Sequence, residues 1–336
     1  MKKRILIIGG AGFIGHNLAI YLKKIGAKVE ILDNLEVNNL GSLKKNVNNV
    51  PDPKLSMQII RERLRLLKKN NIKINKVDAK NHFLVKKIIE KFKPKVVIHL
   101  AAVSHANRSN VNPHHTFDNS LRTLGNVLDN VKNKIDHFIF LSSSMVYGNF
   151  KKKTVKEDDI CNPIGVYGGL KYAAEEIIKS YSQVFNLPYT IIRPSALYGE
   201  RCISRRVGQI FIENALNKKI IKIQGDGEEK LDFTYINDLV EGIVKVIKKN
   251  NSKNQIFNLT YGKSEKINSL LKLISSQFEN VQTNYTTRDK LMPKRGTLST
   301  LKAKKLLNYK SKWPIGTGYI KYINWYKDFY SKKNKY

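Results

Sequence analysis

A glycine-rich turn joins the first apolar segment of the chain to its first helical segment. Residues 5–8 are short, apolar and mostly β-branched, and glycines follow at positions 9, 12 and 15. A strand, a tight glycine turn and the free amides of a helix N-terminus together form a common binding site for dinucleotide phosphates. An ordinary tight turn is the alternative. The next apolar segment, 29–32, is followed by Asp33, at the distance where a carboxylate meets the adenosine ribose hydroxyls.

Asp33 also distinguishes between the two nicotinamide dinucleotides. Its carboxylate would repel the 2′-phosphate of NADP, and no arginine directly follows it. NAD is therefore the predicted cofactor. Asp78 is predicted to hold the adenine edge through the Asp78-Ala79 segment, with an exposed loop as the alternative.

Short apolar segments alternate with segments of helical spacing. The apolar segments are 5–8, 29–32, 96–100, 138–141, 189–192 and 256–259, and the helical ones are 12–25, 83–92, 118–131, 167–185 and 238–248. This alternation is typical of right-handed βαβ units on a parallel sheet. Residues 54–69 are predicted to form an inserted helix ahead of a strand at 72–77. We therefore expect an α/β fold with a doubly wound parallel sheet.

The pattern changes past about residue 195. Residues 203–217 and 264–279 are predicted helices, 281–310 are irregular and polar, and the aromatic residues near the C-terminus predict a docked helix face. We expect residues 1–194, rejoined by about 236–262, to form the dinucleotide-binding domain. Residues 195–235 and 263–336 would form a smaller C-terminal α/β substrate lobe.

Tyr167 and Lys171 predict a general base. They stand four residues apart in a helical segment, so their side chains share one helix face. A phenol has a reference pKa of ~10, so a tyrosine acts as a base near neutral pH only when a cation stabilises the phenolate. The Lys171 ammonium, one turn away, would do this. Serines 142–144 follow the strand segment 138–141 and strengthen the pattern.

The net charge is large but spread out. Lys and Arg number 61 against 27 Asp and Glu, a net charge of +34, and lysine doublets occur along the whole chain. Nucleic-acid binding proteins usually concentrate such charge in one stripe or tail, so we expect no nucleic-acid partner. No apolar stretch reaches the ~18–20 residues of a membrane helix, and the two cysteines provide no disulfide framework. The expected location is the cytoplasm, with no membrane partner and no metal site.

These motifs together resemble the extended short-chain dehydrogenase/reductase superfamily, in particular its NAD-dependent nucleotide-sugar epimerase/dehydratase family and the UDP-glucose 4-epimerase-like enzymes within it. The resemblance covers nearly the whole chain. It implies a Rossmann-type sheet, NAD as cofactor, a nucleotide-diphosphate sugar as substrate and a homodimer. The motifs are GGAGFIG at 9–15, Asp33-Asn34, Val77-Asp78, HLAA at 99–102, SSSMVYG at 142–148, YGGLK at 167–171, RPSALYG at 193–199, GDG at 225–227, DFTYINDL at 232–239 and FNLTYG at 257–262.

The resemblance implies roles for individual residues. Tyr167 would be the base, Lys171 would hold the nicotinamide ribose and lower the tyrosine pKa, and Ser143 would hydrogen-bond the sugar hydroxyl. Asn119 matches the asparagine that supports the catalytic lysine through water, although Arg122 replaces the more usual glycine nearby. The expected cofactor-binding residues are Gly9, Gly12, Phe13, Ile14, Gly15, Asp33, Asn34, Asp78, Ala79, Leu100, Ala101, Ala102, Asn119, Tyr167 and Lys171.

Substrate contacts are expected at the other end of the site. Ser104 and His105 follow the fourth strand, where family members line the sugar pocket, with packing as the alternative. Arginine forks suit phosphate, and Arg295 stands where a late family arginine grips the diphosphate. A solvated helix start is the alternative for Arg205 and Arg206. The expected substrate-binding residues are Ser104, His105, Ser143, Ser144, Arg205, Arg206 and Arg295.

Two departures from the family pattern affect substrate binding. Ala196 stands where an asparagine often meets the substrate, and Leu231 replaces an arginine that commonly meets the diphosphate. Some of the arginines at 201, 205, 206 and 295 are expected to compensate.

The residue at position 145 helps to distinguish among the reactions that the family carries out. Family members oxidise a sugar carbon, typically C4, and dehydratases then use an Asp-Glu pair right after the Ser/Thr, because loss of water needs an acid and a base. This chain has Ser144 and Met145 there, and Met145 also replaces the Glu of decarboxylating relatives and the Cys of C3/C5 epimerases. We expect a 4-epimerase that acts through a transient 4-keto intermediate. The alternatives are a C4 dehydrogenase or keto-reductase and, in another class, a non-catalytic NAD- or RNA-binding Rossmann protein.

Overall fold

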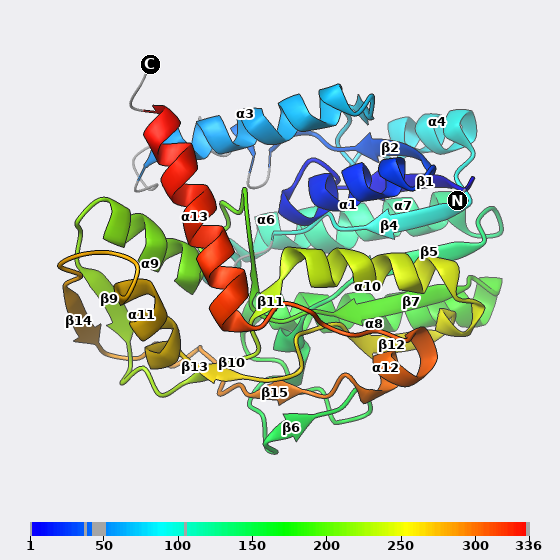
Figure 1. The fold of residues 1–336 in the computed structure, drawn as a ribbon. Coiled ribbons are helices and arrows are strands. Elements are labelled where there is room, and N and C mark those ends of the chain that lie inside the picture. The colour runs from blue at the N-terminus through cyan, green and yellow to red at the C-terminus, as the bar shows by residue number, and fades with distance from the viewer. Residues whose placement is uncertain (1, 37–38, 42–51, 104–105, 334–336) are drawn as a thin grey trace.

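A parallel sheet of seven strands forms the centre of the molecule, in the order β12-β7-β5-β4-β1-β2-β3 (Figure 1). The computed structural model describes residues 2–36, 39–41, 52–103 and 106–333. All neighbouring strands of this sheet run parallel, which confirms the predicted Rossmann-type α/β fold. The strands are β1 Arg4–Ile8, β2 Lys28–Leu32, β3 Lys73–Asn75, β4 Val96–His99, β5 His137–Leu141, β7 Tyr189–Arg193 and β12 Gln255–Asn258.

Helices cover both faces of the sheet, because alternate residues of each buried strand point to opposite faces. Ile5 and Ile7 of β1 pack in one core cluster with α1, α3 and α10, whereas Leu6 and Ile8 pack in a second cluster with α4, α7 and α8. The first group of helices is α1 Phe13–Lys24, α3 Pro53–Lys69 and α10 Ile236–Lys248. The second group is α4 His82–Phe92, α7 Thr123–Val131 and α8 Gly165–Phe185.

Several predicted helices have different bounds in the structure. The segment 118–131 divides into a turn of π-helix, η2 Asp118–Arg122, and the α-helix α7. The helix predicted at 203–217 begins only at Val207, as α9 Val207–Leu216, since Arg201 and Arg205 adopt positive φ angles that an α-helix excludes. The helix predicted at 264–279 is shorter, α11 Ile267–Ser275. The segment 281–310 contains β14 Thr283–Thr286, β15 Thr297–Leu298 and α12 Leu301–Leu307.

Short strand pairs and the C-terminal helix α13 Ile315–Lys333 complete the molecule. β9 Ile221–Gln224 pairs with β14, β10 Lys230–Leu231 with β13 Glu265–Lys266, β8 Leu197–Tyr198 with β11 Thr234–Tyr235, and β6 Thr154–Val155 with β15. Tyr319, Tyr322 and Tyr326 of α13 are buried in the same core cluster as β1, which confirms the docked aromatic face. The division into a cofactor domain and a substrate lobe stays a prediction. In the described part of the chain, no helix has the length and apolarity needed to cross a bilayer.

Candidate active site

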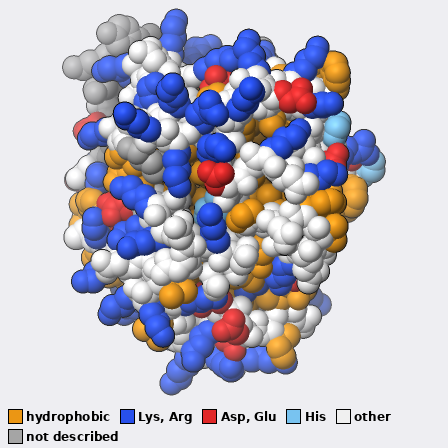
Figure 2. Space-filling model, turned by 90° about the vertical axis from the view of Figure 1, so that its right-hand side faces the viewer, with side chains coloured by type: hydrophobic (Ala, Val, Ile, Leu, Met, Phe, Trp, Pro, Cys, Tyr) orange, Lys and Arg blue, Asp and Glu red, His pale blue; other side chains and the backbone are white. Residues whose placement is uncertain are grey.

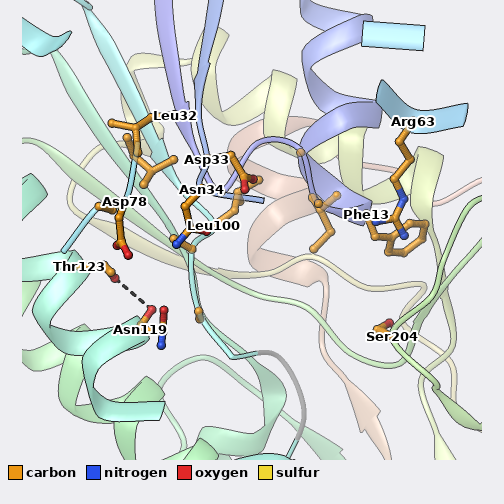
Figure 3. Close-up of a pocket in the computed structure, with 18 of the residues that line it drawn as sticks. Phe13, Leu32, Asp33, Asn34, Arg63, Asp78, Leu100, Asn119, Thr123 and Ser204 are labelled. Carbon is orange, nitrogen blue, oxygen red and sulfur yellow. Dashed lines mark hydrogen bonds between the residues drawn. The ribbon is translucent and has the colours of Figure 1, made fainter. Parts of the chain in front are cut away.

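A cavity opens at the carboxyl ends of β1, β2 and β4 (Figure 3). The strand order reverses between β1 and β4, and this switch point is where doubly wound sheets bind their ligands. The expected cofactor residues from the glycine turn through Asn119 all line this cavity, whereas Tyr167 and Lys171 are not among its lining residues. The lining also includes Ile8, Leu32, Arg63, Val77, Thr123, Ile203, Ser204 and Arg206.

The glycine turn leaves room for a ligand because two of its members allow close backbone approach. A Cβ on Gly9, whose φ is +75°, would lie 2.7 Å from the amide nitrogen of Ala101. A Cβ on Gly15 would lie 2.5 Å from the Cα of Gly10. Helix α1 begins at Phe13, and the first amides of a helix have no intrahelical acceptor. This cradle fits the diphosphate of a dinucleotide.

Asp33 lines the cavity and also hydrogen-bonds the backbone of the glycine turn. Its Oδ2 accepts a hydrogen bond from the Ala11 amide at 2.9 Å, and its Oδ1 accepts one from the Leu35 amide at 2.8 Å. Burial raises the pKa of Asp33, against the opposing effect of these hydrogen bonds. In Figure 3 Asp33 and Asn34 lie on the same side of the cavity as Asp78, so the acidic groups gather at one end.

The π-helical turn η2 carries Asn119 into the cavity. Its side-chain amide donates to the His115 carbonyl at 2.8 Å, and its own carbonyl accepts from the Thr123 hydroxyl at 3.0 Å (Figure 3). Single π-turns inside helices are frequent at functional sites. Arg122, the departure from the family glycine, is an exposed residue that pairs with Asp118 at 3.0 Å.

Ser143 and Tyr167 interact with each other outside the lining of this cavity. Ser143 caps the short 3-10 helix η3 Ser144–Tyr147 by accepting from the Met145 amide at 3.2 Å, and it hydrogen-bonds the Tyr167 phenol. Lys171 is not among the groups that shift the Tyr167 pKa, so its effect on the phenol stays a prediction. Burial raises the pKa of Tyr167, and this effect outweighs the opposing charge of Arg206 and the Ser143 hydrogen bond.

Lys171 is held beneath the end of β5. Its ammonium donates to the Leu141 carbonyl at 2.7 Å and lies 4.7 Å from the centre of the Phe140 ring. Burial lowers the pKa of Lys171 to about 8, although the charge of Glu175 opposes this shift. Glu175 is itself fully buried and accepts two hydrogen bonds from Arg193, at 3.0 and 2.6 Å.

Sequence reasoning missed Glu175 and Arg193, which form the buried ion pair behind Lys171. The signal was present, because Glu175 follows Lys171 by one helical turn and therefore shares its face. Ser142 also donates to Glu175. These hydrogen bonds connect α8 to β5 and β7 and help to position Lys171.

Two arginines on the substrate side carry unpaired donors. The Nε atoms of Arg206 and Arg295 are buried and have no hydrogen-bond partner among the described residues. Burial lowers the pKa of Arg295 to about 10, and the positive charge of Arg206 adds to the shift. Two neighbouring cations whose Nε atoms are buried and unpaired favour an anionic ligand.

The other residues predicted to contact the substrate do not form one cluster. The Arg205 amide donates to the Gln209 side chain at 2.8 Å, and the Ser144 amide donates to the Pro194 carbonyl at 2.9 Å. Arg201 turns toward the glycine-turn side and donates to the His16 ring at 3.2 Å. Ser104 and His105 lie outside the described residues.

Only one of the two departures from the family pattern has a structural explanation. Leu231 is buried in the apolar core, where an arginine would lose its hydration. Ala196 has a φ of +34°, a region that asparagine tolerates better than alanine, so nothing in the structure explains this departure. Within the described ranges, no cluster of three or more His, Cys, Asp or Glu is arranged to hold a metal ion.

The fold and this site define the class of protein. Residues 5–260 match the NAD dependent epimerase/dehydratase family, and the chain belongs to it. It is therefore an enzyme of a family that uses NAD, and the glycine cradle and Asp33 fit that cofactor.

Three individual proteins of known or assigned activity are similar to this chain. The chain is 34% identical over 280 residues to a putative UDP-glucose 4-epimerase of Methanocaldococcus jannaschii, covering 81% of this chain and 82% of that protein. It is 31% identical over 275 residues to a dTDP-D-glucose 4,6-dehydratase of Dictyostelium discoideum, covering 76% of this chain but only 58% of that longer protein. A solved structure of the UDP-glucuronic acid 4-epimerase of Bacillus cereus, in complex with UDP-glucuronic acid and NAD, is 26% identical, with a TM-score of 0.87 over 97% of this chain and 100% of the other.

Proposed function

We propose that this protein is an NAD-dependent nucleotide-sugar 4-epimerase that acts through a transient 4-keto intermediate. The observation that carries the proposal is the contact between Ser143 and Tyr167, with Lys171 one turn away and the NAD cavity beside them. Similarity to 4-epimerases of UDP-sugars supports the choice of substrate class.

The residues suggest how each step is assisted. Bound NAD supplies the hydride acceptor and returns the hydride. Tyr167 takes the proton of the sugar hydroxyl, and Ser143 orients that hydroxyl by hydrogen bonding. The charge of Arg206 favours the phenolate, against the burial that raises the Tyr167 pKa. Lys171, one helical turn from Tyr167, would add a second positive charge.

We assign the substrate diphosphate to Arg206 and Arg295. Their unpaired Nε donors face no acidic side chain closely enough to form an ion pair among the described residues, so a diphosphate would satisfy both. Arg206 also lines the NAD cavity and acts on Tyr167, so it connects the three parts of the site.

Dehydration is disfavoured by the residues after Ser143. Ser144 and Met145 supply neither the acid nor the base that loss of water requires, despite the similarity to a dehydratase. Oxidation or reduction at C4 without epimerisation is the second candidate, because it needs the same Tyr167, Lys171 and NAD.

The test is an incubation with a panel of nucleotide-diphosphate hexoses and heptoses, followed by NMR, with and without added NAD. A 4-epimerase converts a sugar to its C4 epimer without net consumption of NAD, whereas a dehydrogenase produces NADH stoichiometrically. Tyr167→Phe should reduce turnover by at least about 100-fold, since it removes the proton acceptor, and should leave NAD bound.

Tyr181→Phe, on the far part of the same helix α8, is the matched control and should keep full turnover. Full activity in Tyr167→Phe would exclude the proposed mechanism. Retention on RNA or heparin at moderate salt, with no turnover of any nucleotide sugar, would favour the non-catalytic alternative instead.

A further inference from the structure

Arg63 is a charged residue on the buried face of an inserted helix. Its side chain is fully buried, and it lies on α3 in the same stripe as Ile59 and Leu67, which are core residues. Burying a cation is costly unless partners satisfy it, so a position of this kind usually serves a purpose. Burial lowers the pKa of Arg63 to about 10, which leaves it charged at neutral pH.

The partners of Arg63 satisfy only part of its guanidinium. Its Nε donates to the Arg201 carbonyl at 2.8 Å, and Nη2 donates to the same oxygen. Nη1 is buried and has no hydrogen-bond partner among the described residues. No described carboxylate forms an ion pair with it, and Arg63 lines the cavity that fits NAD. An unsatisfied cationic donor therefore borders that cavity.

The position of Arg63 indicates which part of the cofactor it would contact. Figure 3 shows its guanidinium beside Phe13, the first residue of α1, and on the opposite side of the cavity from Asp78 and Asn119. Asp33 and Asp78 mark the adenosine end, whereas the amides that start α1 mark the diphosphate. Arg63 thus lies beside the start of α1, where the diphosphate would bind, and across the cavity from Asp78.

The groups packed around Arg63 include a neutral ring and a second cation. His16 donates from Nδ1 to the Gly12 carbonyl at 2.9 Å and accepts from Arg201 Nε at 3.2 Å, which requires a neutral ring. Burial and the charges of Arg63 and Arg201 all lower the pKa of His16. The Asp33 carboxylate acts on Arg63, and Glu200 and Glu62 act on Arg201, but none of these carboxylates reaches the free Nη1 of Arg63. A bound anion would supply the missing acceptor.

We propose that Arg63 is a cofactor-binding residue whose free Nη1 donates to the diphosphate of NAD. The inserted helix α3 supplies this contact from outside the βαβ unit, and Arg201 and His16 hold the guanidinium and the glycine turn in register. The proposal concerns NAD binding alone. It does not depend on which sugar the enzyme uses, or on whether it epimerises.

The test measures dissociation constants of NAD, ADP-ribose and adenosine for the cofactor-free protein by calorimetry and ligand-observed NMR. Arg63→Gln keeps a donor for the Arg201 carbonyl but removes the charge, and Arg63→Met removes both. Each should weaken NAD and ADP-ribose roughly 10- to 100-fold and leave adenosine, which has no phosphate, unchanged. Arg63→Lys should lose less, because a single ammonium keeps the charge without the fork.

Arg65→Met is the matched control, since Arg65 is exposed on the same helix and pairs with Glu62 at 2.7 Å. It should bind all three ligands as the wild type does. Unchanged NAD affinity in Arg63→Gln would overturn the proposal. An equal loss for adenosine and ADP-ribose would also overturn it, because that pattern indicates a collapsed cavity rather than a lost phosphate contact. Because this readout contains no sugar, it is independent of the proposed 4-epimerase activity.

Discussion

The positive charge of Arg206 lowers the pKa of both Tyr167 and Arg295. The protonation of this site therefore depends on charges that each affect several residues. The sequence pointed to Lys171 as the cation that activates the tyrosine, because the two share a helix face. In the structure the charge that acts on the Tyr167 phenol is that of Arg206, from the start of α9, and the burial of the phenol has the larger effect. Helical spacing shows which residues share a face, but not how deeply a face is buried.

Arg295 allows a test of substrate binding at the scale of one residue. Arg295→Met should raise the KM for the nucleotide sugar roughly 10- to 100-fold with little change in kcat, because a charge-assisted contact to the diphosphate is lost in ground and transition states alike. Steady-state kinetics on the sugar that the NMR panel identifies would measure this. Lys294→Met, at the exposed neighbouring position, is the control and should leave KM unchanged. Unchanged KM and kcat in Arg295→Met would show that the diphosphate lies elsewhere.

At the scale of elements, helix α8 approaches η3 closely because it carries glycines. A Cβ on Gly168 would lie 2.9 Å from the Met145 carbonyl oxygen and 3.0 Å from the Pro163 Cβ, whereas a Cβ on Gly169 meets nothing within 4 Å. The sequence predicted both elements, but it did not show which of the two adjacent glycines is needed. That distinction depends on contacts between segments that are distant along the chain.

This pair gives a matched prediction. Gly168→Ala should lower the free energy of unfolding by about 1–3 kcal/mol, since the added methyl forces η3 away, and should reduce kcat by displacing Ser143. Gly169→Ala should raise the free energy of unfolding by about 0.5–1 kcal/mol, since alanine favours a helix interior more than glycine. Urea denaturation measures both. Equal stability changes in the two variants would contradict the close approach of α8 to η3.

At the scale of the whole molecule, the net charge of +34 is spread over the surface. Figure 2 shows lysines and arginines scattered over one face, with acidic side chains between them, as the doublets along the sequence predicted. A broad positive field steers anionic substrates without forming a defined binding surface. The cytoplasmic location, the homodimer and the absence of a nucleic-acid partner stay predictions.

Buried neutral histidines should make the protein sensitive to acid. Burial lowers the pKa of both His99 and His137 to about 3, and His16 is shifted in the same direction. The unfolded state binds these protons below about pH 6.5 and the folded state does not, so the free energy of unfolding falls as pH falls. Each histidine contributes a slope of about 1.4 kcal/mol per pH unit between its unfolded and folded pKa.

Urea titrations at several pH values from 7 to 5 would measure this slope. His99 stacks against Phe138 and Phe140, so His99→Phe should preserve packing and reduce the slope by about 1.4 kcal/mol per pH unit. The exposed His114 provides the control variant, His114→Gln. A slope that His99→Phe leaves unchanged would mean that His99 is not the buried neutral group described here.

The sequence by itself determined the strand and helix order, the glycine turn and the Tyr167-Lys171 pair, because these depend on local periodicity and on spacing within one element. Only the tertiary structure decided the pairing of Glu175 with Arg193, the proximity of Arg206 to Tyr167 and the place of Arg63. Arg63 was still detectable in the sequence, because it is a charged residue at a position of its helix that is otherwise apolar. Its partners come from residues far along the chain, and burial, charge and hydrogen bonding among such residues are set by packing in three dimensions.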